Sequence, residues 1–224
     1  MTDPTFSTTA NPRQLEAIAT TDSPLLIIAG PGAGKTFTLV ERIVYLITHK
    51  KDLTPENLLV VTFTDKAAQE LTTRISNRLN EIGIRFNLNE MYLGTFHSIC
   101  LRWLEEHREF TRLKRSFMMM DQFDQQFFIY ARIAEYTAIA NIEQVIGSHQ
   151  QSSWNKSKEL LKWINTISEE ALDAQILVNA EDLPVKVLGD CHALYQQQIE
   201  AENALDFSTI QYEALKLLRS KPEI

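Results

Sequence analysis

The sequence is poor in several features that would each point to a particular class of protein. It has two cysteines in 224 residues, Cys100 and Cys191, and their distance in sequence argues for a reducing compartment and against a disulfide framework. The N-terminus (MTDPTFSTTANP) is polar and carries no apolar signal segment. No apolar run approaches the ~20 residues of a membrane-spanning helix. These absences predict a cytoplasmic protein without a membrane partner.

Positive charge is also scarce. The formal net charge is −7, and the whole acidic excess falls in residues 105–224, because residues 1–104 hold equal numbers of basic and acidic side chains. A protein that coats nucleic acid through charge carries a basic patch or stripe. Any nucleic-acid site in this chain is therefore expected to be local and built from particular residues.

Glycine is sparse as well, yet three of the seven glycines fall in one stretch, LLIIAGPGAGKT (25–36). The apolar run 25–30 predicts a strand buried on both faces, and the amphipathic segment 35–49 predicts a helix. Glycines at such a junction let backbone N–H groups point into one concavity, where the helix N-terminus adds partial positive charge. The stretch therefore predicts a phosphate-binding P-loop, with Ala29 in place of the usual first glycine.

Each residue of this loop has an expected role. Lys35 can reach the β- and γ-phosphate oxygens of a nucleotide, and the Thr36 hydroxyl can ligate Mg²⁺, so these two are the expected catalytic residues. The other expected nucleotide-binding residues form the loop backbone and its flank: Ala29, Gly30, Pro31, Gly32, Ala33, Gly34 and Phe37. The alternative, a glycine-rich turn followed by a chance lysine, is disfavoured by the complete G-A-G-K-T ending.

The rest of the first hundred residues alternates between strand and helix patterns. The segments 57–64 and 91–96 predict further buried strands, and the segments 65–79 and 97–107 predict helices after them. This order implies an α/β fold in which helices flank a parallel sheet.

After about residue 105 only helices are expected. They are predicted over 121–139, 154–168, 183–203 and 209–219. The expected domains are a P-loop domain over 1–104, a mostly helical inserted subdomain over 105–200, and a return to the first domain over 201–224. Trp154 and Trp163 of the insert are expected to pack between helices rather than to stack on bases.

Three further segments, together with the loop, carry a resemblance to a known family. NPRQLEAI (11–18) precedes the loop, while TFTDKAAQEL (62–71) and GTFHSICLRWL (94–104) follow it. In this order they resemble the Q motif, motif Ia and the next DNA-contacting motif of superfamily 1 DNA helicases of the UvrD/Rep/PcrA type. The resemblance implies a RecA-like fold, the cofactors ATP and Mg²⁺, and 3′ to 5′ movement along single-stranded DNA and at single-strand/duplex junctions.

The resemblance also implies the roles of individual residues. Gln14 would read the edge of adenine, beside the loop residues that hold the phosphates. Two strand ends would contact DNA, through Phe63, Thr64, Lys66, Thr95, Phe96 and His97. Local alternatives remain open, because Phe63 can be a core residue, Lys66 a solvated lysine at a helix start, and His97 part of a helix cap.

Some features depart from the family pattern. Asp65 replaces the usual asparagine of motif Ia, and its carboxylate would repel a phosphate backbone. Phe37 stands where many members carry an arginine that helps to hold the base, so adenine is expected to rest on stacking. The family's Asp-Glu pair, which holds Mg²⁺ and activates water, occurs nowhere in the sequence. We therefore expect an N-terminal part of a longer helicase, without the C-terminal helicase domains and without ATP turnover of its own.

Three other functions are weighed against this one. The chain can be the helicase part of a RecB/AddA-like helicase–nuclease, which carries related motifs. It can be a non-catalytic module that binds nucleotide, single-stranded DNA or a protein, which the missing Asp-Glu pair favours and the intact Lys35–Thr36 pair opposes. A small P-loop kinase is disfavoured, because a kinase has no need of TFTDKAA or GTFH.

Overall fold

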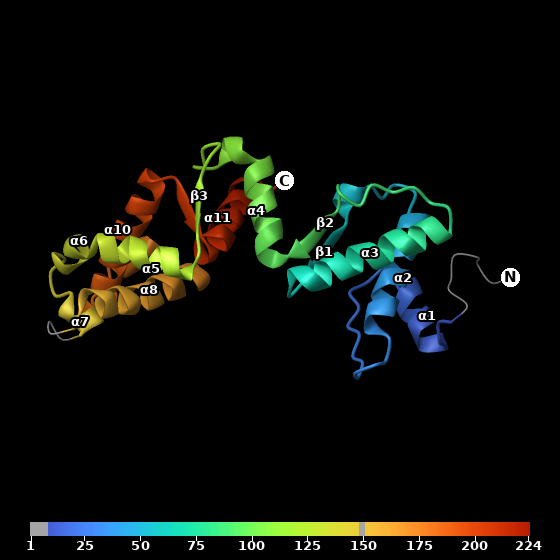
Figure 1. Cartoon of the computed structure of the whole chain (residues 1–224), viewed down its shortest axis with the longest axis horizontal. Helices are drawn as coiled ribbons and strands as arrows, with labels where there is room; N and C mark the ends of the chain where they lie inside the picture. The colour runs from blue at the N-terminus through green and yellow to red at the C-terminus, as the bar shows by residue number, and fades with distance from the viewer. Residues whose placement is uncertain (1–8, 148–150) are drawn as a thin grey trace. The chain divides into compact units, whose positions relative to one another are not determined.

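The computed structural model describes residues 9–147 and 151–224 (Figure 1). The polar stretch 1–8 thus lies outside the described residues. The chain divides into two compact units, Met1–Ile99 and Cys100–Ile224. Both are mixed α/β and mostly helical, with short parallel strands. Within the described ranges, no helix has both the length and the apolar character needed to cross a bilayer.

The first unit packs its helices against a two-stranded parallel sheet. Its elements are α1 (Pro12–Ala19), α2 (Lys35–His49), the 3₁₀ turn η1 (Pro55–Asn57), β1 (Leu59–Thr62), α3 (Asp65–Glu81) and β2 (Tyr92–Thr95). The predicted helix over 35–49 is confirmed as α2, and the predicted helix that starts at residue 65 is confirmed as α3. Their apolar stripes meet the sheet in one core, which includes Val40, Ile43, Val60, Leu71 and Ile75.

The strand predicted over 25–30 is wrong for this structure. These residues form no strand, and Leu26 and Ile28 are 83% and 89% exposed. Apolar character alone does not make a strand, because its N–H and C=O groups must be paired by a neighbouring strand. The sheet of the first unit holds only β1 and β2 among the described residues, and neither is paired with this segment.

The second predicted strand is also less buried than expected. Val60 points into the core and is 8% exposed, whereas Leu59 and Val61 on the opposite face are 51% and 47% exposed. Helices on both sides of a parallel sheet would bury both sets of side chains. Here the core of α2 and α3 covers the Val60 face, so β1 is buried on one face only.

The second unit is built mainly from helices. Its elements are α4 (Phe96–Glu106), which starts within the first unit, η2 (Arg108–Phe110), β3 (Met118–Met120), α5 (Gln122–Ala131), α6 (Ile133–Thr137), α7 (Glu143–Ile146), α8 (Ser153–Glu169), α9 (Ala174–Val178), α10 (Leu183–Ala201), β4 (Ala204–Asp206) and α11 (Phe207–Ser220). The helices predicted over 154–168, 183–203 and 209–219 are confirmed as α8, α10 and α11. The helix predicted over 121–139 is two helices, because Arg132 (φ −112°, ψ 15°) leaves the helical conformation between them.

The expectation that strands stop near residue 105 is wrong. β3 and β4 pair in parallel, with Met118 opposite Ala204. Arg112 stabilises this pair of strands and links it to α11. Its Nη2 donates to the Ala204 carbonyl of β4 at 2.9 Å, and its Nε donates to Glu213 of α11 at 3.2 Å. Three-residue strands are too short for a period-two pattern to reveal them. By their contacts β4 and α11 lie in the second unit, and the predicted return of residues 201–224 to the P-loop domain stays a prediction.

Polar groups are buried in the core of the second unit. Tyr195 Oη donates to the Asp206 carboxylate at 2.5 Å and accepts from Gln125 Nε2 at 3.0 Å. His192, which is 2% exposed, has its Nε2 3.2 Å from Ser168 Oγ. Burial, opposed by the carboxylate of Asp206, lowers the pKa of His192 to about 4.

We therefore expect the second unit to lose stability as the pH falls from about 6.5 to 4. In the unfolded chain the His192 imidazole takes up a proton near pH 6.5, whereas in the folded unit it stays neutral down to about pH 4. The contribution of neutral His192 to the free energy of unfolding is therefore complete above pH 6.5 and decreases as the pH falls to 4. The loss is at most about 3 kcal/mol. Urea unfolding at pH 7, 5.5 and 4 measures it through Trp103, Trp154 and Trp163, all in this unit. The variant His192→Gln should have a flatter pH dependence, and equal dependence in both proteins would contradict the assignment.

Candidate nucleotide and nucleic-acid sites

The glycine-rich loop leads directly into α2. Gly34 is the N-cap of the helix with φ of 80°, and Gly32 has φ of 73°. Both values lie in the left-handed region that favours glycine. No described side chain caps α2, so its first backbone N–H groups lack a partner within the helix. Because these donors and the positive end of the helix dipole coincide, the loop is suited to a phosphate group.

Lys35 lies over the same loop. Its Nζ donates to the carbonyls of Ala29 at 2.9 Å and Gly30 at 2.8 Å. These acceptors are neutral, so a phosphate can replace them with stronger, charge-assisted hydrogen bonds. Thr36 follows in the first turn of α2, and its side chain is exposed.

The donor set near the loop fits Mg²⁺ held through a nucleotide. In residues 9–147 and 151–224 there is no group of three or more His, Cys, Asp or Glu side chains that could hold a metal ion by itself. Mg²⁺ takes several of its ligands from substrate phosphates and water, and needs few from the protein. The exposed Thr36 hydroxyl beside a phosphate loop meets that requirement.

Gln14 joins α1 to the loop. Its Oε1 accepts from the Asn11 N–H at 2.9 Å as part of a capping box, and its Nε2 donates to the Ala33 carbonyl at 3.2 Å. A carboxamide has two N–H donors and two acceptor lone pairs, so one of each remains for the edge of a base. A Cβ atom on Gly34 would stand 2.7 Å from Gln14 Nε2, which means that glycine there also leaves room for this amide.

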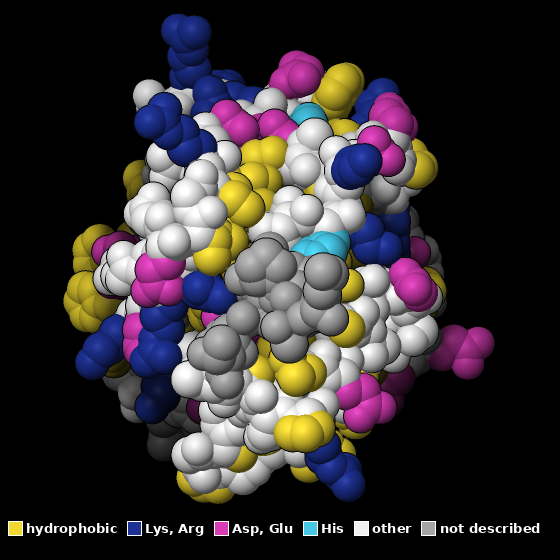
Figure 2. Space-filling model, turned by 90° about the vertical axis from the view of Figure 1, so that its right-hand side faces the viewer, with side chains coloured by type: hydrophobic (Ala, Val, Ile, Leu, Met, Phe, Trp, Pro, Cys, Tyr) yellow, Lys and Arg dark blue, Asp and Glu magenta, His cyan; other side chains and the backbone are white. Residues whose placement is uncertain are grey.

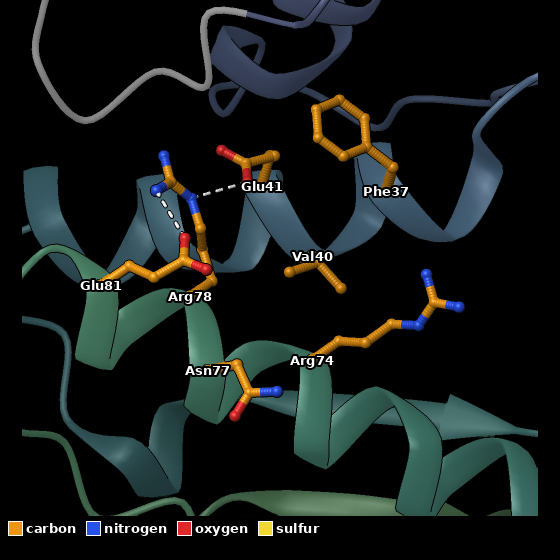
Figure 3. A pocket seen from close by; sticks show the side chains of 7 residues that line it. All are labelled: Phe37, Val40, Glu41, Arg74, Asn77, Arg78 and Glu81. Carbon is orange, nitrogen blue, oxygen red and sulfur yellow. Dashed lines mark hydrogen bonds and ion pairs between the residues drawn. The ribbon is translucent and has the colours of Figure 1, made fainter.

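A pocket of about 300 Å³ lies between α2 and α3, three residues into α2 from the loop. Figure 3 shows Phe37 and Arg74 at one end of it and the ion pair of Glu41 with Arg78 at the other. Arg74 Nη2 also donates to Glu70 at 2.6 Å. No sequence motif marks Arg74 as a site residue, because its pocket wall exists only where α3 packs on α2.

The two segments predicted to contact DNA end at the same edge of the sheet. The parallel register places Thr62 opposite Thr95, so Phe63 and Phe96 each come directly after the last paired residue of their strand. Phe63 is fully exposed (105%) and Phe96 is 49% exposed. The alternative that Phe63 is a core residue is therefore wrong. Ligands of open α/β sheets bind at the carboxyl ends of the strands, which is where both rings lie.

The polar residues of these segments are engaged locally. Thr64 Oγ1 accepts from the backbone N–H three residues later at 3.2 Å, which caps α3. Thr95 Oγ1 donates to Ser98 Oγ at 3.1 Å at the start of α4. Lys66 is exposed and His97 is half-buried. On the face shown in Figure 2, basic and acidic side chains are interspersed.

Comparison with known proteins gives a consistent result. The model of the UvrD/REP helicase N-terminal domain matches residues 10–224. The chain is 32% identical over 219 residues to a Staphylococcus epidermidis protein named ATP-dependent DNA helicase PcrA, an alignment that covers 95% of this chain and 27% of the relative. It is 31% identical over 218 residues to the protein of that name in Staphylococcus aureus, covering 96% and 27%. The chain thus spans 27% of the length of these relatives.

Proposed function

Because the chain belongs to the UvrD/REP helicase N-terminal domain family, we propose that it is the ATP- and single-stranded-DNA-binding portion of a 3′ to 5′ DNA helicase. The observation that carries the ATP-binding part of the proposal is the glycine-rich loop at the N-terminus of α2, with Lys35 and Thr36 in the first turn of the helix. The relatives are far longer, so the remaining helicase domains are assigned to the rest of the protein.

The ATP site uses residues that already surround the loop. Its backbone N–H groups and Lys35 would hold the β- and γ-phosphates of ATP. Thr36 would hold Mg²⁺, which would supply charge neutralisation at the phosphates. Gln14 pairs with the edge of adenine, and the Phe37 ring beside Arg74 offers a stacking surface for the base.

The DNA site uses the strand ends of β1 and β2. Phe63 and Phe96 stack on bases without reading sequence, and the neighbouring Thr64, Lys66, Thr95 and His97 contact the backbone. Asp65 lies in the first turn of α3, where a carboxylate stabilises the helix dipole. That local role explains an acidic residue at an edge otherwise suited to DNA.

This chain is expected to bind MgATP without turning it over, because its sequence contains no Asp-Glu pair to hold the metal and activate water. The test is steady-state hydrolysis with and without single-stranded DNA, with Lys35→Ala as the blank. Turnover above the blank would contradict this expectation, and would show that another carboxylate of the chain completes the site.

Phe63→Ala is expected to weaken binding of single-stranded DNA about tenfold, within the ~1–3 kcal/mol that one stacked base contributes. The ring is fully exposed, so its removal leaves the core intact. Fluorescence anisotropy with a labelled oligothymidine measures the affinity. Leu26→Ala removes an equally solvated apolar side chain outside the strand ends and serves as the control. Equal affinities of Phe63→Ala and the unmodified chain would count against the DNA site.

A further inference from the structure

Exposed aromatic rings gather on one surface of the second unit, in residues that have no role in the sites above. Phe123, Phe127 and Tyr130 recur at helical spacing along α5, and Phe123 and Phe127 are 64% and 54% exposed. The ring centroid of Trp154, from the start of α8, lies 5.9 Å from that of Phe123 and 5.5 Å from that of Tyr130. Contiguous exposed apolar surface of this kind marks interaction sites.

A groove of about 400 Å³ lies between α5 and α8, which run side by side in Figure 1. It is lined in part by the amides of Gln122 and Gln126 and by Lys158 and Lys162. An adjoining hollow of about 390 Å³ contains the same two glutamines together with Phe123, so the groove continues to the rings. Gln126 Nε2 also donates to the Trp154 carbonyl at 3.3 Å, which ties the two elements together.

Two lysines follow the Trp154 ring along the same side of α8. Trp154, Lys158 and Lys162 are each four residues apart, so they share one side of the helix at intervals of about 6 Å. Glu159 and Glu169 also line the groove, and Asp121 lines the adjoining hollow, so three carboxylates accompany the two lysines. The surface is therefore aromatic and amide-rich, and it has no net positive charge.

We propose that this surface of the second unit, α5 with the exposed side of α8, binds single-stranded nucleic acid. Phe123 and Phe127 offer ring faces on which unpaired bases can stack. Bases inside a duplex are stacked on one another, so their faces are not accessible to these rings. Glutamine amides can donate to and accept from base edges, and the two lysines lie within the same groove for the phosphates. The site uses none of the residues at the strand ends of β1 and β2 and none of the residues of the glycine-rich loop.

The small number of cations at this surface predicts a shallow salt dependence. Two phosphate contacts give a slope of about −1.4 in a plot of log affinity against log salt concentration, at ~0.7 per phosphate of a single strand. Stacking supplies the remainder of the affinity and changes little with salt. A slope several times steeper would show that charge, and hence another surface, dominates binding.

The experiment uses the full chain with Phe63→Ala and Phe96→Ala as background, so that the strand-end site is removed. Anisotropy of a labelled oligothymidine is measured before and after adding Phe123→Ala and Phe127→Ala. We expect the remaining affinity to fall at least about tenfold. Phe110→Ala, which removes a 48% exposed ring elsewhere in the same unit, is the matched control and should leave the affinity unchanged. Quenching of tryptophan fluorescence by the oligonucleotide should disappear in Trp154→Phe.

The outcomes separate this site from the proposed function. If the background variant binds no oligonucleotide, or if removing Phe123 and Phe127 changes nothing, this proposal is overturned while the strand-end site stands. If the background changes leave affinity intact and loss of the α5 rings abolishes it, the strand-end site fails and this proposal stands. Self-association that the α5 changes abolish, without any effect on the oligonucleotide, would assign the surface to a second copy of the chain and overturn the proposal.

Discussion

Replacing Glu41 with alanine is expected to lower the free energy of unfolding of the first unit by about 3 kcal/mol, the lower end of the range for breaking a buried ion pair. Arg78 Nε donates to Glu41 Oε1 at 2.8 Å, and the two side chains are 18% and 5% exposed. Without Glu41, the guanidinium stays poorly solvated with one main partner, Glu81, at 3.2 Å. That remaining partner is the reason for expecting the lower end of the range.

Two variants make this prediction specific to the buried pair. Glu70→Ala removes an ion pair with Arg74 at 2.6 Å whose side chains are 55% and 50% exposed, and should cost at most about 1 kcal/mol. Changing Glu41 and Arg78 together to leucine removes both charges and should recover much of the loss. Hydrogen exchange of α2 and α3 amides reports on this unit. Equal costs for Glu41→Ala and Glu70→Ala would contradict the burial argument.

Lys35→Ala is expected to weaken MgATP binding roughly 10- to 100-fold, as follows from the ~1.5–3 kcal/mol contributed by a hydrogen bond to a charged group. The Lys35 side chain is exposed and contacts loop carbonyls, so the fold should be unaffected. Isothermal titration calorimetry measures the change. Lys50→Ala removes the same charge from an exposed pair with Asp22 and should bind MgATP normally. An affinity of Lys35→Ala equal to that of Lys50→Ala would show that the loop does not hold the phosphates.

The helices were predictable from sequence because their signals are local. Caps such as Asn11, Thr64 and Asp182 stand directly before their helices, and each apolar stripe repeats within the helix itself. The glycine-rich turn before α2 was predictable for the same reason. Its positive-φ glycines and its lysine act within a few residues of one another, at the start of a helix that the sequence also marks.

The sheets could not be predicted in the same way, because a strand is defined by its partner. Residues 25–30 are strongly apolar and form no strand. The segments β3 and β4 have only a weak sequence signal, yet they pair with each other although most of the second unit lies between them in sequence. Whether an apolar side chain is buried also depends on which strands pair. The run of apolar residues left open whether Phe63 is a core residue, and only the pairing of β1 with β2 shows that it follows the last paired residue and is fully exposed.

The sequence by itself determined the glycine-rich turn before α2, the principal helices and the family to which the chain belongs. All three depend on residue types at fixed, short spacings, where backbone conformation and capping act locally. The tertiary structure alone decided that Phe63 and Phe96 share an edge, that Arg74 and Phe37 share a pocket, and that α5 and α8 enclose a groove. These arrangements join residues distant in sequence, and packing free energy rather than local preference selects which surfaces meet.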